Sequence, residues 1–224
     1  MKNASILTVA QQSVIAQLAA EQDIVRQFTL SGGTALAAFH LHHRRSDDLD
    51  FFSEKPVDDL RVRRFAEKVR IDFGAPVMEV RRIYDRHLFL IADKNGDQLK
   101  LEFTHYPYTP LESPIIQGGI QVESLRDIAT DKLAALLDRF EPKDYYDLYF
   151  LLRDHTTLQK LRADLQTKFH IIANPVQLGA AFARCRNLPI LPHLLIPVSK
   201  EDVWRFFEKM AKDLKLEVED DATV

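Results

Sequence analysis

Residues 30–52, LSGGTALAAFHLHHRRSDDLDFF, contain the strongest structural signals of this chain. The apolar run at 24–30 predicts a short strand that ends at the Gly32-Gly33 pair. The composition of 34–42 is that of a helix, so the glycine pair lies where a strand meets a helix. Backbone N–H groups at such a helix start are a natural seat for phosphates.

The same stretch ends in a strand with two carboxylates on one face. Residues 47–52 alternate, so Asp48 and Asp50 point one way while Leu49 and Phe51 point into the core. Carboxylates two residues apart on a strand are close enough to share one or two divalent cations. A phosphate seat beside a carboxylate pair is what a magnesium–nucleotide complex needs.

A third carboxylate, Glu102, follows on the polar face of a strand expected at 98–104. The Asn95-Gly96 pair is a strong hairpin signal that joins this strand to one at 87–92. If the Glu102 strand neighbours the Asp48–Asp50 strand, three acidic groups converge, and a cation is the usual remedy for their repulsion. Taken alone, a Gly-Gly turn or an Asp-x-Asp strand is more often an ordinary surface feature than part of a site. The order of a strand, Gly-Gly, a helix, an Asp-x-Asp strand and a later acidic strand is much less expected by chance.

The rest of the chain predicts an α+β fold, in which a mixed sheet flanked by helices at 1–110 precedes a helical domain at 111–224. In the first part, helices are expected at 5–22 and 58–73, with a further strand at 77–83. A proline-dotted link at 106–114 follows. Beyond it the pattern is almost wholly helical, with helices expected at 124–140, 143–153, 157–169, 175–185 and 200–214.

Composition excludes several classes of protein. The 224 residues include 30 Lys and Arg against 33 Asp and Glu, which excludes a globally basic nucleic-acid coat and an acidic disordered tail. The single cysteine, Cys185, excludes a disulfide framework or a Cys-rich zinc module, and we expect it to be structural. With no signal peptide and no long apolar run, a soluble cytoplasmic protein is expected.

Lys132 lies on the apolar side of the helix expected at 124–140. It is one turn from Ile128 and from Leu136, and Arg139 lies two turns further on. An inward-facing lysine costs free energy unless it is paired, and a triphosphate or the carboxylate cluster would pair it. The alternative, in which the side chain extends past the leucines to water, is equally consistent with the pattern.

Asp144 and Asp147 share one face of the helix expected at 143–153. They suit two interpretations, either as partners that orient Lys132 or Arg139, or as acidic residues that stabilise a helix N-terminus after Pro142.

Weaker signals each have an ordinary alternative. His40, His42 and His43 suggest a zinc site, with His40 and His43 on one helix face. Solvated or nucleotide-side histidines are favoured instead, because the two arginines that follow would repel a cation. Residues 61–86 hold eight basic and four acidic residues, which fits an RNA-facing groove or a solvated surface equally. The three tyrosines of the helix at 143–153 could stack on a base but are more consistent with packing. They are Tyr145, Tyr146 and Tyr149.

Together these motifs resemble the AbiEii-type nucleotidyltransferases, toxins of bacterial toxin–antitoxin and phage-abortive systems. The match comprises Gly-Gly-Thr-Ala-Leu at 32–36, His43-Arg44, Ser46, Asp48-Leu49-Asp50-Phe51, and a downstream Lys, Arg and Lys-Asp-x-x-Asp at 132–147. It covers about residues 24–153, and Glu102 stands where Asp is also usual. The nucleotidyltransferase fold is implied.

The resemblance also implies roles for individual residues. Nucleotide would be bound by Gly32, Gly33, Thr34, Arg44, Ser46, Lys132 and Arg139. Mg²⁺ or Mn²⁺ would be held by Asp48, Asp50 and Glu102. The catalytic set would be Asp48, Asp50, Glu102, Lys132 and Asp144.

The implied reaction transfers a nucleoside monophosphate from an NTP to an acceptor hydroxyl on RNA, such as tRNA, and the implied protein partner is an antitoxin. Two alternatives stay open. One is a nucleotide-binding regulatory module without turnover, which acts through a protein partner. The other is a metal-dependent phosphohydrolase that uses the His40–Asp50 cluster.

Overall fold

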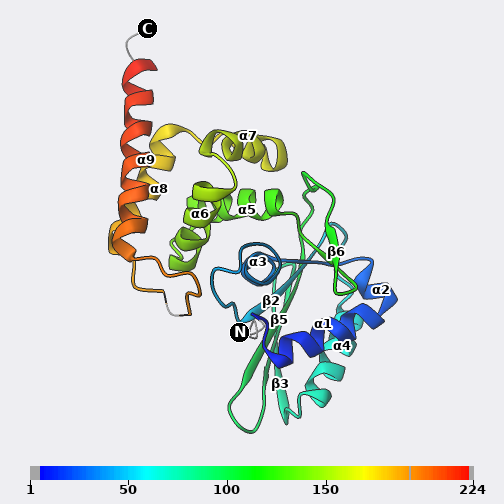
Figure 1. Ribbon diagram of the computed structural model, residues 1–224. Coiled ribbons are helices and arrows are strands. Elements are labelled where there is room, and N and C mark those ends of the chain that lie inside the picture. The colour runs from blue at the N-terminus through cyan, green and yellow to red at the C-terminus, as the bar shows by residue number, and fades with distance from the viewer. Residues whose placement is uncertain (1–5, 192, 222–224) are drawn as a thin grey trace. The chain divides into compact units, whose positions relative to one another are not determined.

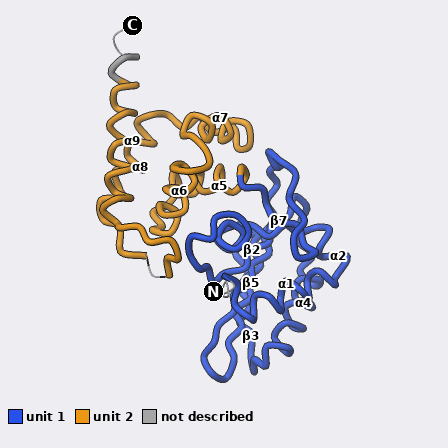
Figure 2. Tube along the Cα trace, viewed as in Figure 1, with its two compact units in different colours: residues 1–125 blue, residues 126–224 orange. Residues whose placement is uncertain are grey.

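The computed structural model describes residues 6–191 and 193–221, and the chain divides into two compact units (Figure 2). The first unit is Met1–Leu125 and the second is Arg126–Val224. The division lies beyond the boundary expected at residue 110, because two more strands of the sheet follow the proline-dotted link. None of the helices in the described residues is long and apolar enough to cross a membrane.

A seven-stranded mixed sheet forms the centre of the first unit, with the order β3-β4-β5-β2-β1-β7-β6. Its strands are β1 (Thr29–Ser31), β2 (Asp48–Ser53), β3 (Val77–Ile83), β4 (Arg86–Ala92), β5 (Gln98–His105), β6 (Ile115–Gln117) and β7 (Ile120–Val122). The β2–β5 and β1–β7 pairs are parallel, and the other four pairs are antiparallel.

The apolar face of this sheet packs around Phe103 on β5. Its ring centroid lies 5.0 Å from that of Phe28 and 5.1 Å from that of Phe51. Phe65 and Phe89 meet the same ring edge-on. Because alternate strand residues point to opposite faces, filling one face with these rings leaves the carboxylates of β2 and β5 on the other.

Helices of the first unit cover the sheet. They are α1 (Val9–Ala20), α2 (Gln22–Val25), α3 (Gly32–Ala35), the π-helical segment η1 (Leu36–Leu41) and α4 (Asp59–Asp72). The N-terminus of α4 is capped by the Asp58 carboxylate, which accepts from the Arg61 N–H. Figure 1 shows α1 and α4 together on one side of the sheet, while α3 lies next to β2.

The longer elements in the described part of the second unit are all helices, as expected. It comprises α5 (Leu125–Asp138), α6 (Pro142–Asp154), α7 (Leu158–Phe169), α8 (Pro175–Ala183), a 3₁₀ turn η2 (Arg184–Asn187) and α9 (Lys200–Asp221). The packing interpretation of the tyrosines is correct, because Tyr145 and Tyr146 are buried. Their hydroxyls donate to backbone carbonyls of Ala181 at 2.7 Å and Pro189 at 3.0 Å.

Three local features differ from the prediction. The strand expected at 24–30 is reduced to β1, because the N–H groups of Ile24 and Val25 bond to the Glu21 carbonyl and form a helical turn. The helix expected at 34–42 begins earlier, at Gly32, and widens to a π-helix. The β6–β7 hairpin was missed, although Gly118 and Gly119, both with positive φ, are typical of its turn.

Candidate functional site

The glycine pair after β1 lies directly against the acidic strand. Gly32 has φ +67°, and a Cβ atom there would come within 2.6 Å of Asp50 Oδ2. At Gly33 a Cβ would lie 2.6 Å from Arg44 Nη2 and 2.9 Å from Ser46 Oγ. Only residues without a side chain allow this approach. The structure thus brings these five residues together, as their assignment to one site requires.

Thr34 and Arg44, also expected at this site, are buried beside the turn. The Thr34 hydroxyl donates to the Asp48 carbonyl, which joins the helix start to β2. Arg44 Nη1 donates to the Arg45 carbonyl at 2.8 Å. Gln11 on α1 was missed by the sequence reasoning: its amide donates to the carbonyls of Ser46 at 2.8 Å and Asp47 at 3.1 Å.

The three carboxylates lie on neighbouring strands, because β5 is the neighbour of β2 as predicted. Asp50 is the register partner of Glu102 in the parallel β2–β5 pair, and Asp48 is the partner of Lys100. On its other side Asp50 is paired with Ser31 of β1. The acidic residues therefore lie on two adjacent strands, at the edge where the glycine turn begins α3.

Two cations that the sequence reasoning missed contact these carboxylates. Lys100 Nζ lies 2.8 Å from Asp48 Oδ2. Arg86 on β4 holds Glu102 through two hydrogen bonds of 2.6 and 2.9 Å. No local motif identifies Lys100 or Arg86, since the pairing depends on the register of strands that meet only in the folded sheet.

The charges of all three carboxylates act on Lys100. Burial opposes its charged form, but the hydrogen bond to Asp48 and the charges of Asp48, Asp50 and Glu102 outweigh burial and raise the pKa of Lys100. The hydrogen bond to Glu102 likewise raises the pKa of Arg86, and Asp50 adds to the effect. Both cations therefore stay charged beside the carboxylates.

The donor set suits a hard divalent cation. Carboxylate oxygens are the ligands that Mg²⁺ and Mn²⁺ prefer, and this cluster already attracts positive charge. In the described part of the chain, no three His, Cys, Asp or Glu side chains are arranged as ligands of one metal ion. Asp48 and Glu102 are instead directed at Lys100 and Arg86.

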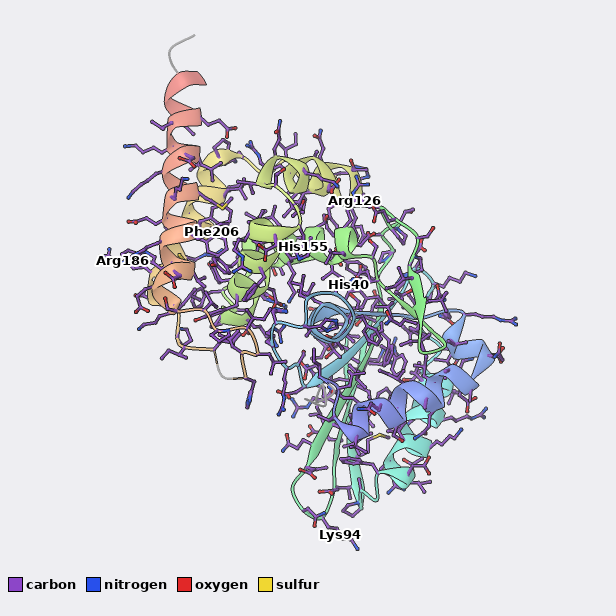
Figure 3. The ribbon with its side chains drawn as sticks, in the orientation of Figure 1. His40, Lys94, Arg126, His155, Arg186 and Phe206 are labelled. Carbon is purple, nitrogen blue, oxygen red and sulfur yellow. The ribbon has the colours of Figure 1, made fainter. Side chains whose placement is uncertain are left out.

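The histidines of the same segment are not grouped as expected. His40 Nε2 lies 2.9 Å from the Glu123 carbonyl (Figure 3 labels His40). The helix ends at Leu41, and His42 adopts a left-handed conformation with φ 54°. His43 therefore leaves the helix, and the expectation that it shares a helix face with His40 was wrong.

Lys132, in the second unit, is buried and paired rather than extended to water. Its Nζ lies 2.7 Å from Asp144 Oδ1 and 2.6 Å from Asp147 Oδ2. The side chain of Lys132 is 9% exposed, and those of the two aspartates are 1% and 0% exposed. Arg139 adds a longer contact, 3.3 Å to Asp144 Oδ2, from an exposed position. The interpretation in which Lys132 extends past the leucines to water was therefore wrong, and Lys132 is paired with Asp144 and Asp147.

Comparisons with known proteins identify the family of this chain. The model of a family described as "Nucleotidyl transferase AbiEii toxin, Type IV TA system" matches residues 16–221. An uncharacterized protein of Aquifex aeolicus (strain VF5) is 38% identical over 139 residues, which make up 59% of this chain and 61% of that protein. The chain thus matches less than two thirds of that relative's length.

Two solved structures share the fold. A putative nucleotidyltransferase from H. pylori superposes with a TM-score of 0.63 at 18% identity, covering 94% of each chain. JHP933 from Helicobacter pylori gives the same TM-score and identity, over 96% of this chain and 92% of its own. The mixed sheet followed by helices is therefore a nucleotidyltransferase fold.

Proposed function

Because this chain belongs to the AbiEii family of nucleotidyltransferase toxins of type IV toxin–antitoxin systems, we propose that it transfers a nucleoside monophosphate from an NTP to a hydroxyl on RNA, such as tRNA. The observation that carries the proposal is the contact of the Gly32-Gly33 turn with Asp50, Arg44 and Ser46. This contact supports the proposal, because a turn that binds phosphates would adjoin the acidic residues there, and chemistry on a triphosphate needs both. We place the reaction in the cytoplasm, where NTPs and RNA are available.

In this proposal the turn and its neighbours bind the triphosphate. The N–H groups at the start of α3 face phosphate oxygens, and the buried Arg44 guanidinium and the Ser46 hydroxyl supply further donors. Thr34 supports them by fixing α3 to the Asp48 carbonyl. The Cβ-free backbone of the glycine pair lets phosphates approach as closely as Asp50 does.

The acidic cluster would hold Mg²⁺ or Mn²⁺ through Asp48 and Asp50, with Glu102 as a third ligand or as a base. When bound, such a cation would neutralise the carboxylates and polarise the reacting phosphate. Arg86 donates to both oxygens of Glu102, and a carboxylate held in this way is better suited to a ligand than to a base. The carboxylates would also orient the acceptor hydroxyl towards the α-phosphorus.

The bond changes balance without another reagent. The acceptor oxygen forms a bond to the α-phosphorus, the bond from that phosphorus to the bridging oxygen breaks, and pyrophosphate leaves. The hydroxyl proton passes to a carboxylate or to water. The resemblance of the second-unit motif to the family gives three more residues a role in this proposal. Lys132 and Arg139 neutralise phosphate charge, and Asp144 positions Lys132 or activates the acceptor hydroxyl.

The proposal is tested by incubating the protein with labelled NTPs, Mg²⁺ and total RNA. Label should appear in RNA with the wild type and disappear with Asp48→Ala. Asp47→Ala is the matched control, because Asp47 is the exposed neighbouring carboxylate and its replacement should leave transfer unchanged. Label in no acceptor, or equal transfer by Asp48→Ala, contradicts the proposal. NTP binding by calorimetry without product would instead support the non-catalytic module.

An antitoxin partner is part of the same proposal. Expression of the chain alone should arrest bacterial growth, and Asp48→Ala should relieve the arrest. Growth arrest that persists with Asp48→Ala would separate the toxicity from nucleotidyl transfer.

A further inference from the structure

Lys100 and Arg86 contact the carboxylates of the acidic cluster in different ways. Lys100 makes one hydrogen bond to Asp48, and the two side chains are 32% and 28% exposed. Arg86 makes a bidentate pair with Glu102, whose side chain is 6% exposed. A single partly exposed ion pair is weak, whereas removing the partner of a buried carboxylate leaves an uncompensated charge.

We propose that Lys100 is an internal counter-ion, which holds Asp48 until a divalent cation replaces it, while Arg86 remains bound to Glu102. The inference rests on the proposed function, since it concerns the cation of that site. It assigns distinct roles to two residues outside the nucleotidyltransferase motif. Lys100 competes with the metal ion, and Arg86 is a permanent positioning residue for Glu102.

The electrostatics of the sheet favour such a counter-ion. Asp48, Asp50 and Glu102 lie on adjacent strands, and like charges this close repel one another when no cation is present. Lys100 is the register partner of Asp48, so its side chain emerges on the same face and reaches the carboxylate without a change in the backbone. A divalent cation carries twice the charge and can contact more than one carboxylate, so it displaces the ammonium group once its concentration is sufficient.

The counter-ion lowers the affinity for metal ions, because its positive charge repels an approaching cation and its hydrogen bond occupies Asp48 Oδ2. Neutralising Lys100 without shortening it should therefore strengthen metal binding. Most other losses of a residue at a binding site weaken binding, so the direction of the change is diagnostic.

The test measures Mn²⁺ binding without nucleotide, by electron paramagnetic resonance of the free ion. Lys100→Met should bind Mn²⁺ about tenfold more tightly than the wild type, from the loss of one positive charge near the ion. Lys100→Arg should stay close to the wild type. The matched control is Lys94→Met in the exposed β4–β5 turn (Figure 3), which should leave the affinity unchanged.

A thermal unfolding measurement keeps the inference testable if Lys100→Met destabilises the protein. Without metal its melting temperature should fall, because Asp48 loses the ammonium group that contacts it, and saturating Mn²⁺ should raise the melting temperature by more than in the wild type. Equal or weaker Mn²⁺ binding by Lys100→Met, together with an equal Mn²⁺-induced shift, overturns the inference. The Mn²⁺ measurement contains no NTP, so such a result does not contradict the proposed nucleotidyl transfer. Conversely, the absence of label transfer to RNA contradicts the proposed function, whatever the Mn²⁺ affinities are.

Discussion

Replacing Lys132 by Met should destabilise the second unit strongly, although the two side chains are similar in length. The substitution leaves Asp144 and Asp147, at 1% and 0% exposure, without the ammonium group that lies 2.7 and 2.6 Å away. Removing one partner of a buried ion pair costs about 3–5 kcal/mol, and here two carboxylates lose it. We expect a fall of at least about 3 kcal/mol in the free energy of unfolding, measured by urea denaturation.

Arg139→Met is the control for this prediction. Arg139 contacts the same Asp144 at 3.3 Å, but its side chain is 58% exposed. The loss of such an exposed partner should cost less than about 1 kcal/mol. Hydrogen exchange should show the effect of Lys132→Met in α5 and α6. If both variants lose the same small amount of stability, burial does not govern this cluster and the reasoning is refuted.

Three further results are expected. Gly32→Ala should cost about 1–2 kcal/mol by denaturation, because a residue with a Cβ is strained in the left-handed region. The new Cβ should also displace Asp50 and abolish label transfer, so unchanged transfer would contradict the close packing. Burial raises the pKa of Cys185 to about 12, so native protein should resist iodoacetamide at pH 8, and rapid native alkylation would argue against burial. Because the unfolded thiol ionises first, stability should fall as pH rises from about 9 to about 12. Tyr145→Phe should cost about 1 kcal/mol in urea unfolding through loss of the bond to the Ala181 carbonyl, and an unchanged midpoint would contradict this.

The sequence predicted the acidic cluster because its signals are periodic and local. Alternation in β2 places Asp48 and Asp50 on one face, and the Asn95-Gly96 turn places Glu102 on a strand of known direction. The register that joins these strands is a property of the whole sheet. Lys100 and Arg86 therefore could not be assigned, because a cation on a strand has no identifiable partner until the neighbouring strand is known.

Predictions were less accurate where tertiary packing overrides local preference. Ile24 and Val25 are β-branched and favour a strand, yet they belong to a helical turn that buries Ile24. The β6–β7 hairpin has strands of three residues each, too short for alternation to be visible. For Lys132 the pattern was equally consistent with a buried, paired side chain and with one that extends to water. The choice depended on whether Asp144 and Asp147 of the next helix face Lys132.

The parallel pairing of β2 and β5 also governs when the acidic cluster can form. Asp48 and Lys100 are far apart in the sequence, with a separation of 52 residues. Parallel strands cannot be joined by a tight turn, so a long loop must close before the two residues meet. The β4–β5 hairpin is local and can form earlier. A growing polypeptide has no cluster until β5 has been synthesised, so fragments that end before Gln98 lack both Glu102 and the counter-ion. Prematurely terminated chains of this kind are therefore expected to be inert in nucleotidyl transfer.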